Sequence, residues 1–155
     1  MTDERLEENL RLLGIKADRI GLISLLPLVQ VAWADGQIQE AERALLLEIG
    51  ERHGLIQPGD EAVIATWLSE EPSPYFQDTA RKLLLELVRR ASLPEGLDRG
   101  AVVAWCWAIA AAAGGIFGSR LMAISNEERD ALDEIAEALG IVQVPEGWIE
   151  LIRPG

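Results

Sequence analysis

The chain has 155 residues and a formal net charge of −12 at pH 7. This length is sufficient for one domain with a hydrophobic core. Because an acidic surface repels nucleic acids and anionic membranes, the charge argues against both as partners and favours cations or basic protein surfaces. The single cysteine, Cys106, can form no intramolecular disulfide, which indicates the cytoplasm. The acidic N-terminus contains no apolar stretch that would predict a signal peptide.

The first elements expected along the chain are helices. Thr2 is a suitable N-cap for a first helix, which Gly14 ends. A second helix begins at Asp18 and carries no charge from residue 20 to residue 34. Pro27 lies inside it and removes one backbone hydrogen bond, so a bend is expected there.

The most informative stretch follows this helix and reads Ala34-Asp35-Gly36-Gln37-Ile38-Gln39-Glu40-Ala41-Glu42. Asp-Gly is a common turn pair, because glycine readily adopts positive φ. After the turn, apolar residues recur at helical spacing as far as a glycine stop at Gly54. Residues 18–56 are therefore predicted to form a helical hairpin with two acids, Asp35 and Glu42, at its bend.

The segments after this hairpin are also predicted to be helical. The expected helices span about 58–69, 76–91, 98–113, 125–139 and 145–152. No segment alternates with period two for long, so no strand is predicted. Residues 100–119 are uncharged over about the length of a membrane span, but they are rich in alanine and contain Gly114-Gly115. A buried central helix is therefore favoured over a membrane span.

An internal repeat links the two halves of the chain. Residues 42–55 and 128–141 are identical at seven of fourteen positions, and each copy follows an uncharged helix. The repeat predicts a second hairpin at about 98–142 that packs with the first around a common core. The expected fold is thus all-α, a single compact domain over residues 1–155 with seven or eight helices and two pseudo-repeated hairpins.

The two copies differ at the bend. Gly114 takes the place of Asp35, and residues 116–123 replace the single Gln37. A site built on Asp35 is therefore expected to be asymmetric. The insertion, whose apolar part is residues 116–122, is either a loop that covers the core or an exposed surface that contacts a protein partner.

The bend motif, Ala34-Asp35-Gly36-Gln37-Ile38 followed by Glu42, resembles that of the TerB-like family of tellurite-resistance and stress-response proteins. The resemblance extends over about residues 20–141. It implies an all-helical, bacterial, cytoplasmic protein with no known catalytic reaction, in which the acids at the bend bind a metal. Gly114 and the insertion after it depart from the family pattern.

The spacing of the bend also matches half of an EF-hand loop. In that register Val31 and Trp33 would occupy ligand positions without offering a side-chain oxygen, which excludes a standard calcium loop. Asp35, Glu42 and the carbonyl of Gln37 remain as predicted ligands of a divalent cation, and Glu128 or Glu127 from the second hairpin would complete the set. The sequence does not distinguish among Ca²⁺, Mg²⁺, Mn²⁺ and Zn²⁺.

The same residues also have a purely structural interpretation. Asp35 can belong to a turn, Glu42 can cap a helix behind Gln39, and Glu128 can form a capping box with Ser125. Two functions follow, both non-enzymatic. The first is a cation-binding stress-response protein, and the alternative is a metal-free acidic module that binds other proteins. No phosphate-binding loop, activated nucleophile or histidine cluster suggests an enzyme.

Overall fold

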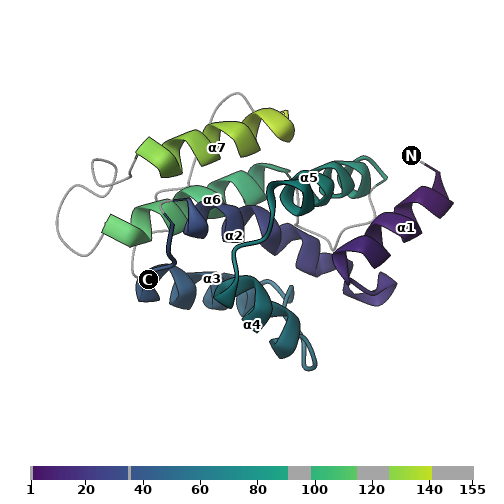
Figure 1. The fold of residues 1–155 in the computed structure, drawn as a ribbon, viewed down its shortest axis with the longest axis horizontal. Helices are drawn as coiled ribbons and strands as arrows, with labels where there is room; N and C mark the ends of the chain where they lie inside the picture. The colour runs from purple at the N-terminus through teal and green to yellow at the C-terminus, as the bar shows by residue number, and fades with distance from the viewer. Residues whose placement is uncertain (1, 35, 91–98, 115–125, 141–155) are drawn as a thin grey trace.

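The computed structural model describes residues 2–34, 36–90, 99–114 and 126–140, and every regular element in these ranges is a helix (Figure 1). This confirms the all-α prediction. The elements are α1 (Asp3–Leu13), the 3₁₀ helix η1 (Ala17–Leu25), α2 (Leu26–Trp33), α3 (Glu40–Arg52), α4 (Glu61–Ser69), α5 (Pro74–Arg89), α6 (Arg99–Gly114) and α7 (Asn126–Ala138). The insertion at 116–123 and the short helix predicted at 145–152 lie outside the described residues.

Two helices, α2 and α6, occupy the middle of the fold. Six of the eight residues of α2 are buried, and α2 contacts α3, α5, α6 and α7. The helix α6 contacts α2, α3 and α7. In Figure 1, α7 lies on one side of this central pair and α3 on the other, while α1 lies at the far end of α5. No described helix is both long and apolar enough to cross a membrane.

The predicted second helix is divided in two. Residues 17–25 form the 3₁₀ helix η1, and the α-helix α2 begins only at Leu26. Pro27 lies in the first turn of α2. Backbone N–H groups in the first turn of an α-helix have no acceptor within the helix, so a proline, which has no N–H, costs no hydrogen bond there. The proline therefore begins an α-helix rather than bending the middle of one, which corrects the prediction.

Capping side chains fix where two of the outer helices begin. The hydroxyl of Thr2 accepts a hydrogen bond from the Arg5 N–H (3.3 Å), as predicted for α1. The hydroxyl of Ser73 does the same for the Phe76 N–H (3.1 Å) at the start of α5. From this start, α5 packs its apolar stripe against η1, α1, α2 and α7.

The end of α3 leaves no room for a side chain at Gly50. The Gly50 carbonyl accepts hydrogen bonds from the N–H groups of Leu55 (2.8 Å) and Ile56 (3.1 Å), so the chain folds back over it. A Cβ atom added to Gly50 would lie 2.3 Å from Cδ1 and 2.6 Å from Cγ1 of Ile56. The glycine is therefore required by this close approach.

We expect Gly50→Ala to destabilise the protein. Overpacking costs about 1–3 kcal/mol, and the higher helix propensity of alanine offsets about 1 kcal/mol of that. Gly21→Ala is the matched control, because a Cβ there would meet Leu55 only at 3.6 Å. Urea unfolding followed by tryptophan fluorescence measures both variants. Gly50→Ala should therefore be less stable than Gly21→Ala, and equal stability of the two variants would contradict this account.

A cluster of charges joins α5 to α1. Glu86 accepts hydrogen bonds from Arg89 Nε (3.1 Å) and Arg90 Nε (2.8 Å), and Arg90 also pairs with Asp3 (2.6 Å). Hydrogen bonds from Arg89 and Arg90 lower the pKa of Glu86 from 4.5 to about 2. The folded state therefore favours the ionised form of Glu86 more strongly than the unfolded state does.

The lowered pKa predicts an acid-dependent loss of stability. The contribution of Glu86 is complete above pH 4.5 and is lost as the pH falls toward 2. Glu86→Gln cannot titrate, so its stability should fall less steeply than that of the wild type in this interval. Thermal melting at several pH values measures the two slopes, and parallel curves would refute the assignment.

Candidate functional site

The bend between α2 and α3 adopts the predicted glycine turn. Gly36 has a φ of 97°, and its N–H donates to the carbonyl oxygen of Trp33 at 2.8 Å. Asp35 lies outside the described residues. Its predicted role as a metal ligand therefore stays a prediction.

The other two predicted ligands are buried acids at equivalent positions. Glu42 is 0% exposed at the third position of α3, and Glu128 is 1% exposed at the third position of α7. Glu42 Oε1 accepts a hydrogen bond from the N–H of Gln39 (2.9 Å), so Glu42 forms the predicted capping contact. The corresponding partner of Glu128, Ser125, lies outside the described residues. The capping contact involves one carboxylate oxygen of Glu42, so it does not conflict with the prediction that Glu42 binds a metal.

Among the described residues, no group of three or more histidine, cysteine, aspartate or glutamate side chains is placed to hold a metal ion. Four other described acids, Glu71, Glu127, Asp130 and Glu134, line a wider cavity beside the bend. Cys106 is fully buried, as predicted, and burial raises the pKa of its thiol, which disfavours the reactive thiolate.

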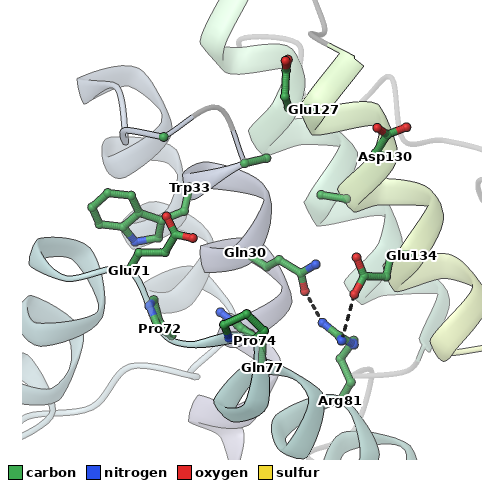
Figure 2. Close-up of a pocket in the computed structure, with 13 residues that line it drawn as sticks. Gln30, Trp33, Glu71, Pro72, Pro74, Gln77, Arg81, Glu127, Asp130 and Glu134 are labelled. Carbon is green, nitrogen blue, oxygen red and sulfur yellow. Dashed lines mark hydrogen bonds and ion pairs between the residues drawn. The ribbon is translucent and has the colours of Figure 1, made fainter.

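A cavity of about 460 Å³ lies where the bend, the start of α5 and the first turns of α7 meet (Figure 2). Trp33, Ala34 and Gly36 line it from the bend. The polar side chains that line it are Gln30, Glu71, Gln77, Arg81, Glu127, Asp130 and Glu134. The structure thus brings the first bend next to the first turns of α7, where Glu127, Asp130 and Glu134 line the cavity.

The cavity has a negative net charge. Its described lining includes four carboxylates, those of Glu71, Glu127, Asp130 and Glu134, and one guanidinium, that of Arg81, which leaves −3. Figure 2 places the three acids of α7 on one side of the cavity and Glu71 on the other. Such an arrangement attracts cations and repels anions.

Arg81 is part of the wall of the cavity and has several partners. It is 8% exposed and donates hydrogen bonds to the Gln30 side chain and, at 3.0 Å, to Glu134 Oε1, with Asp78 at 3.7 Å (Figure 2). These contacts connect α5 to α2 and to α7. Arg81 therefore holds three helices together around the cavity.

Two further side chains define the wall. Trp33 is half-buried, and its indole Nε1–H donates to the carbonyl oxygen of Trp67 at 2.8 Å, which fixes the position of the ring. Gln77 is only 5% exposed, and its amide oxygen has no hydrogen-bond partner in the described part of the chain. A buried acceptor in this state is costly unless a donor from a ligand or from water reaches it.

The sequence analysis assigned no role to Gln77 and Arg81. Both lie on the buried face of α5 together with Ala80 and Leu84. A detectable signal was present, because two polar residues four positions apart interrupt an otherwise apolar stripe. Such residues in a buried stripe indicate a polar contact inside the fold.

The capping contact of Glu42 predicts the behaviour of two variants. Glu42→Ala should lose about 1–3 kcal/mol, because a charge-assisted hydrogen bond is removed at a buried position. Glu42→Gln keeps an acceptor for the Gln39 N–H and should lose less. Glu40→Ala, at an exposed position in the same helical turn, is the control and should change stability by less than about 0.5 kcal/mol. Chemical denaturation measures all three, and wild-type stability of Glu42→Ala would exclude the capping role.

Comparisons with protein-family models, with curated proteins and with solved structures found no match to this chain. The resemblance to the TerB-like family therefore depends on the residues of the bend and on their second copy.

Proposed function

We propose that this chain is a non-enzymatic, TerB-like protein of the bacterial cytoplasm, with a role in tellurite resistance or stress response, that binds a divalent cation at the Asp35-Gly36 bend. The observation that carries the proposal is the burial of two carboxylates, those of Glu42 and Glu128, each at the third position of its helix. The bend lies next to the first turns of α7, because Ala34 and Gly36 line one cavity together with Glu127 and Asp130.

The packing of the helices supports a repeated architecture. In this proposal the pair α2 and α3 forms one hairpin and the pair α6 and α7 the other, and α2 contacts α6 directly. The cross-contacts are reciprocal, because α2 also contacts α7 and α6 also contacts α3. Glu42 and Glu128 occupy the same helical position in their respective hairpins and are both buried. An approximate two-fold relation between the hairpins accounts for all of these features.

In this proposal Asp35 and Glu42 bind the cation, and Glu128 contributes from the second hairpin. All three supply carboxylate oxygens, which are typical ligands of Ca²⁺, Mg²⁺ and Mn²⁺. Zn²⁺ usually occupies sites rich in nitrogen and sulfur ligands, so this set favours the other three cations. When bound, the cation would neutralise carboxylates that burial otherwise destabilises. Its role is therefore to stabilise and organise the bend.

Thermal unfolding of chelator-treated protein tests the metal proposal. Each of the four cations is added separately, and a cation at one hundred times its dissociation constant should stabilise the folded state by about 2.7 kcal/mol. Asp35→Ala should abolish that gain. Asp133→Ala, at an exposed position of α7, should retain it. No stabilisation by any cation would refute the proposal.

The second candidate is a metal-free acidic module that binds a basic partner. Two observations favour it. Glu42 already serves as a helix cap, and the cavity beside the bend has a net charge of −3 among its described residues. The predicted interaction surfaces were a charged face and the insertion at 116–122. The insertion lies outside the described residues, so the acidic cavity is the supported surface.

A further inference from the structure

We propose that the cavity between the bend, α5 and α7 binds an organic cation that carries a guanidinium or primary ammonium group on an alkyl chain. This inference rests on the second candidate function and names its ligand. It does not require a metal at the bend.

The size of the cavity fits a small organic ligand. Its volume of about 460 Å³ is within the range of about 300–1,000 Å³ that is typical of small-molecule sites. A bare cation needs oxygen ligands within about 2.0–2.6 Å on several sides. The acids that line this cavity form no such group among the described residues.

The charge of the cavity selects a cation over an anion. Arg81 is the basic residue among the described lining, and its guanidinium already contacts Glu134 and Asp78. An anion would have to displace these carboxylates while facing the other acids of α7. A cation meets the net charge of −3 directly.

The hydrogen-bonding groups of the wall require a donor. Gln77 is 95% buried, lines the cavity and has an amide oxygen with no partner within the described ranges. In Figure 2 its side chain lies behind Pro74, and the oxygen is covered, so a donor reaches it once the side chains around it shift. Ionised carboxylates also only accept hydrogen bonds. A guanidinium offers five N–H donors and an ammonium three, which matches this excess of acceptors.

The remaining wall suits an alkyl chain with a cationic end. Trp33 is one of the lining residues, its ring lies beside Glu71 (Figure 2), and the hydrogen bond to Trp67 fixes the position of the ring. Rings of this kind attract guanidinium and ammonium groups through their negative faces. Pro72, Pro74 and Ala131 add apolar surface next to the acids. The cavity therefore combines a charged region with an apolar one.

Isothermal titration calorimetry with agmatine and spermidine, in a buffer that contains a metal chelator, tests this inference on the full chain. Saturable binding with one ligand per chain is expected. Asp130→Asn removes a carboxylate from the cavity and should weaken binding about two- to fivefold. Gln77→Met removes the buried acceptor at similar length and should weaken binding about three- to tenfold. Asp133→Asn, on the same helix as Asp130 but not in the lining, should bind as the wild type does.

The controls separate this site from general charge attraction and from the metal site. Butylurea, a neutral compound, should not bind, and added NaCl should weaken agmatine binding without abolishing it. Equal binding by Asp130→Asn and Asp133→Asn, or no saturable binding of either cation, would overturn the inference. Because a chelator is present throughout, failure of the metal proposal leaves this result unchanged.

A peptide arm identifies the source of the cationic group. The peptide Gly-Arg-Gly, with acetylated and amidated ends, is compared with its citrulline counterpart, which has the same shape without the charge. Tighter binding of the arginine peptide than of agmatine would assign the cavity to a basic segment of a protein. The reverse order would assign it to a free small cation. If the citrulline peptide bound as tightly as the arginine peptide, the requirement for a positive charge would be contradicted.

Discussion

The whole structure depends on burying two apolar helices against each other, α2 and, after its first residue Arg99, α6. No residue of α2 is charged, and most of α2 has no contact with water. Each surrounding helix must therefore cover part of this pair with an apolar face of its own, as α5 and α7 do. Because Arg99, at the first position of α6, is the one charged residue of the two central helices, the acids and bases around them lie on the other helices and at the connections. The bend after α2 is one of these connections, and a cavity rich in acids lies beside it.

The fold could be predicted from the sequence to the extent that it follows from periodicity and from caps. The stripe of α5, the Thr2 cap of α1 and the glycine turn at Gly36 are local signals, and each corresponds to an observed feature. The division of residues 17–33 into η1 and α2 could not be predicted in this way. A proline in an apolar sequence can either begin a helix or kink the middle of one. Packing against the neighbouring helices determines which of the two structures forms.

The candidate site was only partly predictable. The acid-bearing bend and its closeness to α7 follow from the repeat, and Glu42 was recognised both as a ligand and as a cap. The contacts of Arg81 with Gln30 and Glu134 join residues more than fifty positions apart, so no local pattern reveals them. Glu71 comes from the connection between α4 and α5, outside both helices, so no helical periodicity points to it. Cavities assembled from several elements require the tertiary structure.

The hydrogen bond from Trp33 to the carbonyl oxygen of Trp67 has a further consequence. The carbonyl groups near the end of α4 lack partners within their own helix, and the indole satisfies one of them. The ring thus loses its rotational freedom when the protein folds, before any ligand arrives. A ligand that contacts the ring has no entropy cost of ordering it, so this wall of the cavity is preorganised. The same bond makes the position of the ring sensitive to α4, a helix that lines none of the cavity.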